Sequence, residues 1–211
     1  EMKDDNNMTP LLLSCVYGTL EVFNVLFDRS DKFILDRRKN SSLHITAHHG
    51  HIELMQRILD WMRNGDWKEK IKLLHLENNE GKTALQLAVE GDHPLVVEQL
   101  MKEYKSHPSR FNINEMGMLH EAAAKGYSDI VSILIEKANM NIEAEDAEGR
   151  LPIHHAAKHN HVNLLQYLLQ KKFETIESTD NQGFTPLLLA ASSNAIDALK
   201  VLLENRAKYR V

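Results

Sequence analysis

The sequence predicts an all-α protein, a solenoid of about six stacked helix-turn-helix repeats with β-turn hairpin tips. Three observations support this fold class. A helix-opening residue recurs at separations of 32, 42, 34, 34 and 34 residues: Thr9, Ser41, Thr83, Gly117, Leu151 and Thr185. An apolar pair recurs in the second helix of each copy: Leu26-Phe27, Ile58-Leu59, Leu100-Met101, Leu134-Ile135, Leu168-Leu169 and Leu202-Leu203. An Asp or Asn lies five residues before each opening residue: Asp4, Asp36, Asn78, Asn112, Asp146 and Asp180. A period near 33 residues is typical of a repeat array, in which each copy packs on its neighbours.

The stretch 146–172 shows the repeated unit most clearly. Asp146 and Gly149 favour a tight turn, because Asp bonds its own backbone and Gly accepts a positive φ. Pro152 suits the first turn of a short helix, where its missing N–H leaves no hydrogen bond unmade. Asn160 ends that helix, and leucines at helical spacing predict a longer second helix after it.

The other copies follow this unit with local departures. We place the repeats near residues 4–35, 36–59, 78–105, 112–145, 146–179 and 180–211. The first predicts helices over 9–17 and 20–27, and the second predicts helices over 43–49 and 52–62, with breaks at Gly18 and Gly50. Lys39 stands where the second turn prefers Gly, the third break shifts to Gly91-Asp92, and Gly117 weakens the opening of the fourth helix pair.

Extra residues near 60–74 separate the second and third repeats. Their apolar residues extend the second outer helix or form a short extra helix, with Asn64-Gly65 as a turn signal. Both tryptophans of the chain, Trp61 and Trp67, fall here. One interpretation is that they form a docking knob for a partner; the other is local packing against the outer flank of the array.

The repeats resemble the ankyrin repeat, whose T-P-L-H-x-A signature recurs along the chain. It survives as Thr9-Pro10-Leu11-Leu12, Leu43-His44, Leu119-His120-Glu121-Ala122, Pro152-Ile153-His154-His155-Ala156 and Thr185-Pro186-Leu187-Leu188. The resemblance covers nearly the whole chain. It implies that His44, His120 and His154 occupy the histidine site of the signature, where the ring bonds backbone near the neighbouring turn.

Composition limits the classes of partner. The net charge is −5 and 26% of the residues are charged, so neither nucleic acid nor an anionic membrane is expected as a partner. No apolar run of 18 residues occurs, so we expect no membrane insertion by this chain, and the start EMKDDNN does not resemble a signal peptide. The single Cys15 excludes an internal disulfide, fits a reducing compartment and is expected to be buried and inert. Because no polar capping helix follows Lys208, we expect a piece of a longer array.

The sequence indicates no enzymatic chemistry. It contains no phosphate-binding loop, dinucleotide fingerprint, nucleophile elbow or H-E-x-x-H motif, so we expect no enzyme and no cofactor. Histidines gather at 48–51, with Glu53, and at 159–161. Zinc requires side chains that converge, whereas His48 and His49 splay apart on a helix and His51 lies past the break. We therefore expect surface histidines and no metal site.

The repeat phase also predicts a binding surface. In a stacked array, the hairpin tips and the exposed ends of the inner helices line one concave face. The variable positions on that face are Met8, Val16 and Tyr17; Leu35, Arg37, Arg38, Asn40, His48 and His49; Glu77, Glu80 and Glu90; Phe111, Ile113, Met116 and Lys125; Glu148, Arg150, Lys158 and His159; and Phe184. Aromatic, Met and Arg side chains together are typical of protein-binding hot spots. We expect a protein partner or a sister subunit there.

The irregular features resemble one group of ankyrin proteins. The segments MKDDNNMTPL and RRKNSSLH, with the insertion before LHLENNEGKTALQLA, are similar to the cytosolic array of ankyrin-type transient receptor potential (TRPA) channels over about three repeats. This resemblance implies an integral plasma-membrane parent, a homotetrameric cation channel whose cytoplasmic array contributes to assembly and gating. The reactive cysteines of that family have no obvious counterpart, so Cys15 alone cannot supply electrophile sensing. The alternative is a soluble ankyrin scaffold or adaptor that recruits a protein through its concave face.

Overall fold

The computed structural model describes residues 3–64, 71–106, 117–205 and 207. Contacts divide the chain into two compact units, Glu1–Phe111 and Asn112–Val211. The regular secondary structure of the described residues is helical, without a β-strand. The predicted all-α class is therefore confirmed.

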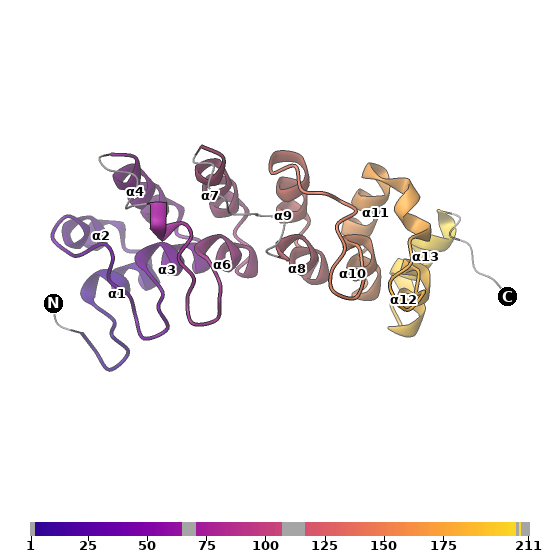
Figure 1. Ribbon diagram of the computed structural model, residues 1–211, viewed down its shortest axis with the longest axis horizontal. Coiled ribbons are helices and arrows are strands. Elements are labelled where there is room, and N and C mark those ends of the chain that lie inside the picture. Colours follow the sequence, from indigo (N-terminus) through magenta and orange to yellow (C-terminus); the bar gives the residue numbers. More distant parts are fainter. Residues whose placement is uncertain (1–2, 65–70, 107–116, 206, 208–211) are drawn as a thin grey trace. The chain divides into compact units, whose positions relative to one another are not determined.

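The first unit consists of paired helices. The described pairs are α1 (Pro10–Tyr17) with α2 (Leu20–Phe27), α3 (Ser42–His48) with α4 (Ile52–Arg63), and α6 (Ala84–Glu90) with α7 (Pro94–Ser106). In Figure 1, α1, α3 and α6 form one row and α2, α4 and α7 form a second row, and neighbours in each row are in contact. The insertion extends α4 to Arg63 and adds a short 3-10 turn, η1 (Ile71–Leu73). In the described part, it therefore both lengthens the second outer helix and forms a short extra helical turn.

The second unit repeats the pairing. Its described elements are α8 (Met118–Lys125), α9 (Ser128–Ser132), α10 (Pro152–Lys158), α11 (Val162–Lys171), α12 (Pro186–Ser192) and α13 (Ile196–Glu204). A π-helical turn, η3 (Ile133–Lys137), continues α9, and a 3-10 turn, η4 (Phe173–Glu177), follows α11. The inner helices α8, α10 and α12 contact one another in order, as the repeat phase requires.

The predicted opening residue of each copy is the N-cap, and the first helix begins at the residue after it. The Thr9 and Thr185 hydroxyls each accept a hydrogen bond, at 3.3 Å, from the backbone N–H three residues later, which satisfies one of the free donors of the first turn. Gly117 has no side chain to do this, and α8 begins without a side-chain cap. The expected weakness of that opening is present in the structure.

The signature histidines join each inner helix to the loop of the next copy. His154 Nδ1 accepts from the Leu151 N–H at 3.0 Å, so the proton lies on Nε2, which donates to the Ser178 carbonyl at 3.0 Å. His44 makes the equivalent bonds, and Nε2 of His120 lies 2.8 Å from the Ala144 carbonyl. Burial lowers the pKa of His44 and of His154, which keeps both rings neutral. The expected structural role of these three histidines is confirmed.

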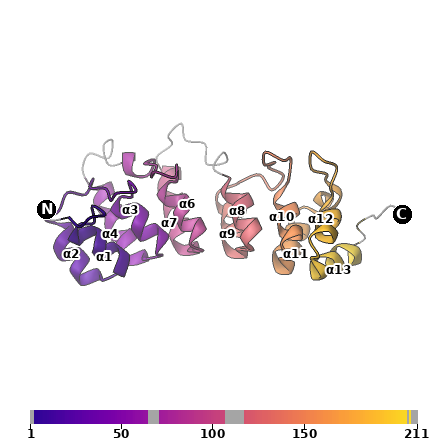
Figure 2. The same ribbon diagram turned by 90° about the horizontal axis from the view of Figure 1, so that it is seen from below.

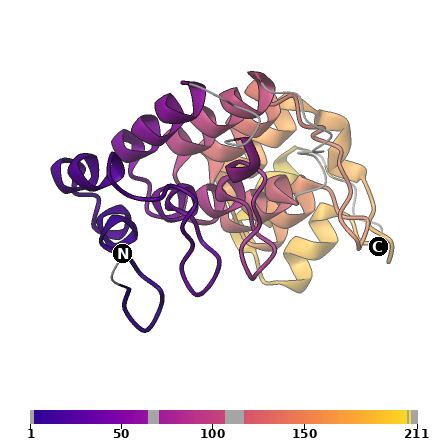
Figure 3. The same cartoon turned by 60° about the vertical axis from the view of Figure 1, so that its left-hand side comes forward.

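In the five loops of this kind that the structure describes, the Asp or Asn before the helix pair folds the loop that it begins. Asp36 Oδ1 accepts from the backbone N–H groups of Arg38 and Asn40 at 2.8 and 2.7 Å. The same two bonds form at Asp4, Asn78, Asp146 and Asp180. The third residue after each has a positive φ: Asn7, Lys39, Gly81, Gly149 and Gly183. Figure 3 shows the loops before α1, α3 and α6 projecting on one side of the first unit.

Backbone hydrogen bonds hold neighbouring loop tips together. The Arg37 N–H donates to the Asn6 carbonyl at 2.8 Å, and the Asn79 N–H donates to the Arg38 carbonyl at 2.9 Å. In the second unit, the Asn181 N–H donates to the Glu148 carbonyl at 3.0 Å. Figure 2 shows the loops before α10 and α12 projecting side by side. These hydrogen bonds therefore fix the backbone positions from which the tip side chains project.

A second set of histidines joins three of the outer helices, α4, α7 and α11, to the inner helix of the preceding copy. Nε2 of His51, His93 and His161 lies 3.0, 2.9 and 2.8 Å from the carbonyls of Val16, His48 and Ala124. A Cβ on Gly18 would lie 2.4 Å from the His51 ring, so this glycine provides room as well as a φ of +69°. The predicted breaks hold, and in the third copy Asp92 adopts the left-handed conformation.

The recurring apolar pairs contribute to the core between copies. Leu100, Leu134, Leu168 and Leu202 are fully buried, whereas Leu203 remains 39% exposed. The packing role expected of the second pair member therefore fails at Leu203. Cys15 is fully buried, and burial raises the pKa of its thiol to about 12, so the group stays protonated and unreactive at neutral pH.

Candidate functional site

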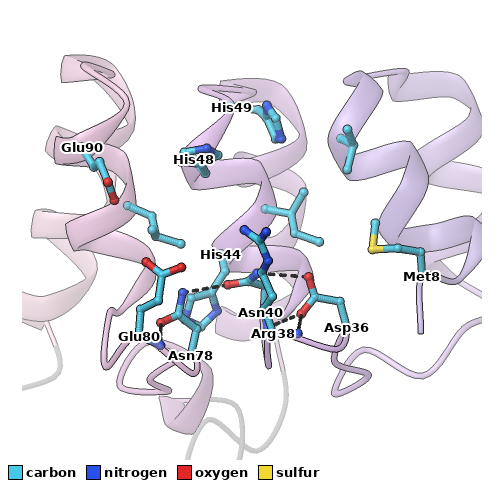
Figure 4. Close-up of a pocket in the computed structure, with 13 residues that line it drawn as sticks. Met8, Asp36, Arg38, Asn40, His44, His48, His49, Asn78, Glu80 and Glu90 are labelled. Carbon is cyan, nitrogen blue, oxygen red and sulfur yellow. Dashed lines mark hydrogen bonds between the residues drawn. The ribbon is translucent and has the colours of Figure 1, made fainter. Parts of the chain in front are cut away.

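A groove of about 410 Å³ lies in the first unit, between the loops before α3 and α6 and the ends of the inner helices (Figure 4). It is lined by Met8, Val16, Asp36, Arg38, Asn40, His44, Ile45, His48, His49, Asn78, Glu80, Leu87 and Glu90. The structure thus brings together eight residues of the predicted binding face: Met8, Val16, Arg38, Asn40, His48, His49, Glu80 and Glu90. Each of the three copies contributes one part of the wall.

Arg38 occupies the centre of the groove. Figure 4 shows its side chain rising from the loop toward the end of α3 that carries His48 and His49. The nearby Asp36 carboxylate is occupied: Oδ1 accepts two backbone N–H groups and Oδ2 accepts the Asn40 amide at 3.0 Å. Arg38 is exposed and forms no ion pair with any described residue. Its guanidinium is therefore available to a ligand.

The third copy supplies a wall with a negative net charge. Lys82 Nζ lies 2.7 Å from the Glu90 carboxylate and 3.6 Å from that of Glu80, so one lysine serves two glutamates. The Glu80 side chain remains 56% exposed. Glu77, also predicted as a binding residue, lies three residues before Glu80 in the sequence. It is exposed but does not line the groove.

Histidines form the rim at the C-terminal end of α3. The rings of His48 and His49 are exposed and lie 5.1 Å apart, and the His49 ring stacks on His51 at 5.8 Å. Partial burial lowers the pKa of His49, and the neighbouring His48, His51 and His93 lower it further by like-charge repulsion. His49 is thus uncharged at neutral pH and can either donate or accept a hydrogen bond.

The first copy supplies an apolar wall. Met8 and Val16 are half-buried there, and the buried Ile45 of α3 and Leu87 of α6 form the floor of the groove on the second and third copies. Tyr17, another predicted binding residue, follows Val16 and is 74% exposed, but it does not line the groove. The groove therefore presents apolar, basic and acidic chemistry on successive copies.

The other predicted residues that the structure describes do not line this groove. Arg37 is exposed at the same loop tip, and Phe184 is half-buried in the loop before α12. Trp61 is half-buried and packs edge-on against Phe27 and Phe33 at centroid distances of 5.9 Å, as local packing requires. Trp67, Phe111, Ile113 and Met116 lie outside the described residues. Arg150, also expected on the binding face, instead bonds the buried Asp180 at 3.2 Å.

The sequence did not single out several lining residues. Ile45 falls within a predicted helix and Leu87 carries no assigned role, while Asp36 and Asn78 are predicted only at the repeated turns. Their contribution depends on the packing of adjacent copies, for which the sequence carries no separate signal. Within the described residues, no three His, Cys, Asp or Glu side chains gather closely enough to hold a metal ion. No described helix is long and apolar enough to span a bilayer.

Comparison with known proteins places these features in a family. A family model of ankyrin repeats, in three copies, matches residues 12–114, 43–146 and 119–211. The human ASB11 ankyrin repeat domain superposes with a TM-score of 0.78 at 20% identity, over 97% of this chain and 86% of that one. A chain from the complex of a Bdellovibrio bacteriovorus predatory endopeptidase with immunity protein Bd3460 gives 0.72 at 21% identity, over 93% and 98%.

Curated relatives include two cation channels. A Caenorhabditis elegans homolog of transient receptor potential cation channel subfamily A member 1 is 33% identical over 90 residues, 43% of this chain and 7% of that protein. The human subfamily A member 1 channel is 29% identical over 140 residues, 64% of this chain and 11% of that protein. The chain thus spans about a tenth of the length of these relatives.

The match is not confined to channels. The Caenorhabditis elegans poly(ADP-ribose) polymerase tankyrase is 27% identical over 157 residues, 69% of this chain and 7% of that protein. The ankyrin fold generally serves as a protein-interaction module, and its helix pairs, Asx-turn loops and signature histidines are all present here. The chain belongs to the ankyrin repeat family.

Proposed function

We propose that this chain is a non-enzymatic, protein-binding part of the cytoplasmic ankyrin array of a TRPA-type cation channel. In this proposal the parent is an integral plasma-membrane homotetramer, and the array contributes to its assembly and gating. Similarity to two TRPA-type channels supports the parent. The observation that carries the binding role is the groove of the first unit, where Arg38 has no ion-pair partner among the described residues.

The groove has the properties of a recognition surface. Exposed charges of opposite sign lie on adjacent copies, so a partner is favoured in one orientation and repelled in others. The tip side chains carry little of the core, because the loop is held by Asp36 and by backbone hydrogen bonds. The tip side chains can therefore be replaced without loss of the fold.

The test is association of the full-length product. Replacing Arg37 and Arg38 together with alanine should weaken binding to sister subunits or to an isolated partner by at least ~1 kcal/mol if a hot spot is removed. The melting temperature should stay nearly unchanged. Phe111→Ala, at a predicted contact outside the described residues, should behave in the same way. Arg29→Ala, an exposed arginine away from the groove, serves as the control.

Two outcomes would count against this site. If the Arg37/Arg38 variant and Phe111→Ala bind like the wild type while Trp67→Ala abolishes association, the insertion is the docking site. If Arg29→Ala weakens binding as much as the Arg37/Arg38 variant, the effect reflects general charge and not the groove.

A soluble ankyrin scaffold or adaptor is the second candidate. The similarity to tankyrase covers more of the chain than either channel match, which favours a general ankyrin module. The sequence of the complete transcript separates the two. A channel requires six apolar spans of about 20 residues in the same reading frame. Their absence would leave the scaffold, and their presence with tetramers in cross-linked membranes would establish the channel.

A further inference from the structure

We propose that the groove binds an extended protein segment bearing an apolar, an acidic and a basic side chain, in that order and about three residues apart. This inference rests on the proposed binding role of the groove and specifies the chemistry of the partner. It follows from the order of the three walls, each supplied by a different copy. Figure 4 shows that order from Met8, through Arg38, to Glu80 and Glu90.

The acidic side chain belongs at the centre. The guanidinium of Arg38 is exposed and has no ion-pair partner among the described residues, and the Asp36 carboxylate beside it is committed to the loop. A carboxylate is the ligand that a guanidinium binds with two parallel hydrogen bonds. His48 and His49 on the rim above can add further hydrogen bonds to the same group or to the backbone of the segment.

The basic side chain belongs on the third copy. Glu77, Glu80 and Glu90 carry three negative charges there, and Lys82 offsets one of them. Lys82 contacts Glu90 more closely than Glu80, so the half-exposed Glu80 has unused acceptor capacity. A lysine or arginine of the segment would fill it.

The apolar side chain belongs on the first copy. Met8 and Val16 are partly exposed there and carry no charge. Exchanging the acidic and basic positions of the segment would place a cation against Arg38 and an anion against Glu80. Like charges in contact oppose binding, so the order is discriminated in whichever direction the segment runs.

The spacing follows from the packing of the inner helices. α1, α3 and α6 lie side by side, and packed helix axes are about 8–10 Å apart. An extended chain advances about 3.3–3.6 Å per residue. Side chains that meet successive copies are therefore about three residues apart.

The experiment is selection from a displayed library of random 12-residue peptides on the whole chain. Parallel selections use Arg38→Glu, Glu80→Lys and, as the matched control, Arg29→Glu, each first shown to be folded by circular dichroism and thermal melting. We expect enrichment of the apolar, acidic, basic order with wild type and with the control. Arg38→Glu should weaken the selected peptides at least tenfold, and Glu80→Lys should remove the preference for the basic residue.

The outcomes separate the inference from the binding role. Peptides that depend on Arg38 but show no charge order would overturn the inference and leave the binding role standing. Peptides indifferent to both Arg38→Glu and Glu80→Lys, or no enrichment at all, would overturn both. Self-association of the chain that is lost in Arg38→Glu would identify a second copy as the occupant and would also refute a separate segment.

Discussion

Two hairpin loops, one in each unit, share a backbone and differ in how they use charge. In both Asp36–Asn40 and Asp146–Arg150, the first carboxylate accepts two backbone N–H groups and the fourth residue has a positive φ. The fifth residue then bonds the next loop in each case. Asn40 Oδ1 accepts from the Asn78 amide at 3.0 Å, whereas Arg150 donates to the buried Asp180 at 3.2 Å.

The third residue of each loop shows what this division permits. Arg38 and Glu148 are both exposed at that position, opposite in charge, on loops of the same form. The backbone conformation of the loop therefore depends on the first, fourth and fifth residues and not on the side chain of the third. In the second loop Arg150 binds the neighbouring loop through Asp180, whereas in the first loop Arg38 lines the groove. One frame can thus present different surfaces without a change of fold.

The largest effect should come from the core beneath the loops. Leu168 in α11 is fully buried, so Leu168→Ala should lower the free energy of unfolding by about 2–5 kcal/mol through lost burial and a residual cavity. Urea unfolding measures this. Leu203→Ala is the matched control, because that leucine is 39% exposed and should lose much less. A change at Leu168 below about 0.5 kcal/mol would contradict the packing described here.

Removing the first carboxylate of a loop should cost more stability at Asp180, which is buried, than at Asp36. Asp180→Ala deletes the acceptor of Arg150 and of two loop N–H groups, which should cost about 1.5–3 kcal/mol because one donor is charged. Asp36→Ala removes an acceptor whose donors are all uncharged, so its cost should be smaller. The comparison requires urea unfolding of both variants. Equal losses would show that the Arg150–Asp180 pair adds nothing to cohesion.

Relieving the strained turn should have a smaller effect of opposite sign. Lys39 has a φ of +62°, where the other unit has Gly149. Lys39→Gly should therefore stabilise the chain by about 1 kcal/mol, the low end of the left-handed penalty for a residue with Cβ. Gly183→Ala tests the converse, since its φ is +81° and no atom lies within 4 Å of the added Cβ. A loss on Lys39→Gly would mean that the lysine side chain itself stabilises the loop.

The smallest change at neutral pH should be at a signature histidine. Gln86 already accepts the Thr83 N–H at 2.9 Å in the third copy, so His154→Gln can keep the equivalent bond. At pH 7.5 the loss should be within about 1 kcal/mol, the value of one neutral hydrogen bond. The Ser178 carbonyl contact is the bond at risk.

The same variant should reduce the dependence of stability on acid. Burial lowers the pKa of His154 in the folded chain, so the unfolded chain binds more protons once the pH falls below about 6.5. Stability from this group is fully present above that pH and is lost as the pH falls toward the folded pKa. Urea unfolding at pH 7.5 and 5.0 should show a smaller loss for His154→Gln than for wild type. Equal losses would assign the acid sensitivity to other histidines.

Local signals in the sequence predicted most of the fold. The Asx turns, the caps and the breaks depend on residues within about five positions of one another, so each copy could be read by itself. Arg150 and Leu203 show the limit. Whether Arg150 faces a ligand or Asp180 depends on the next loop, and the exposure of Leu203 depends on what packs beside it. The groove was predicted by phase at Arg38 and Glu80, but its apolar floor required the packed helices.

The histidine contacts between copies also impose an order in time on synthesis. Val16, His48 and Ala124 each offer a helix-end carbonyl to a histidine that lies 35, 45 or 37 residues later in the chain. A copy of this kind that leaves the ribosome cannot make this contact at its inner helix end until the following copy has also emerged. Because chains are made from the N-terminus, these three inner helix ends gain their histidine contact only after the following copy has emerged.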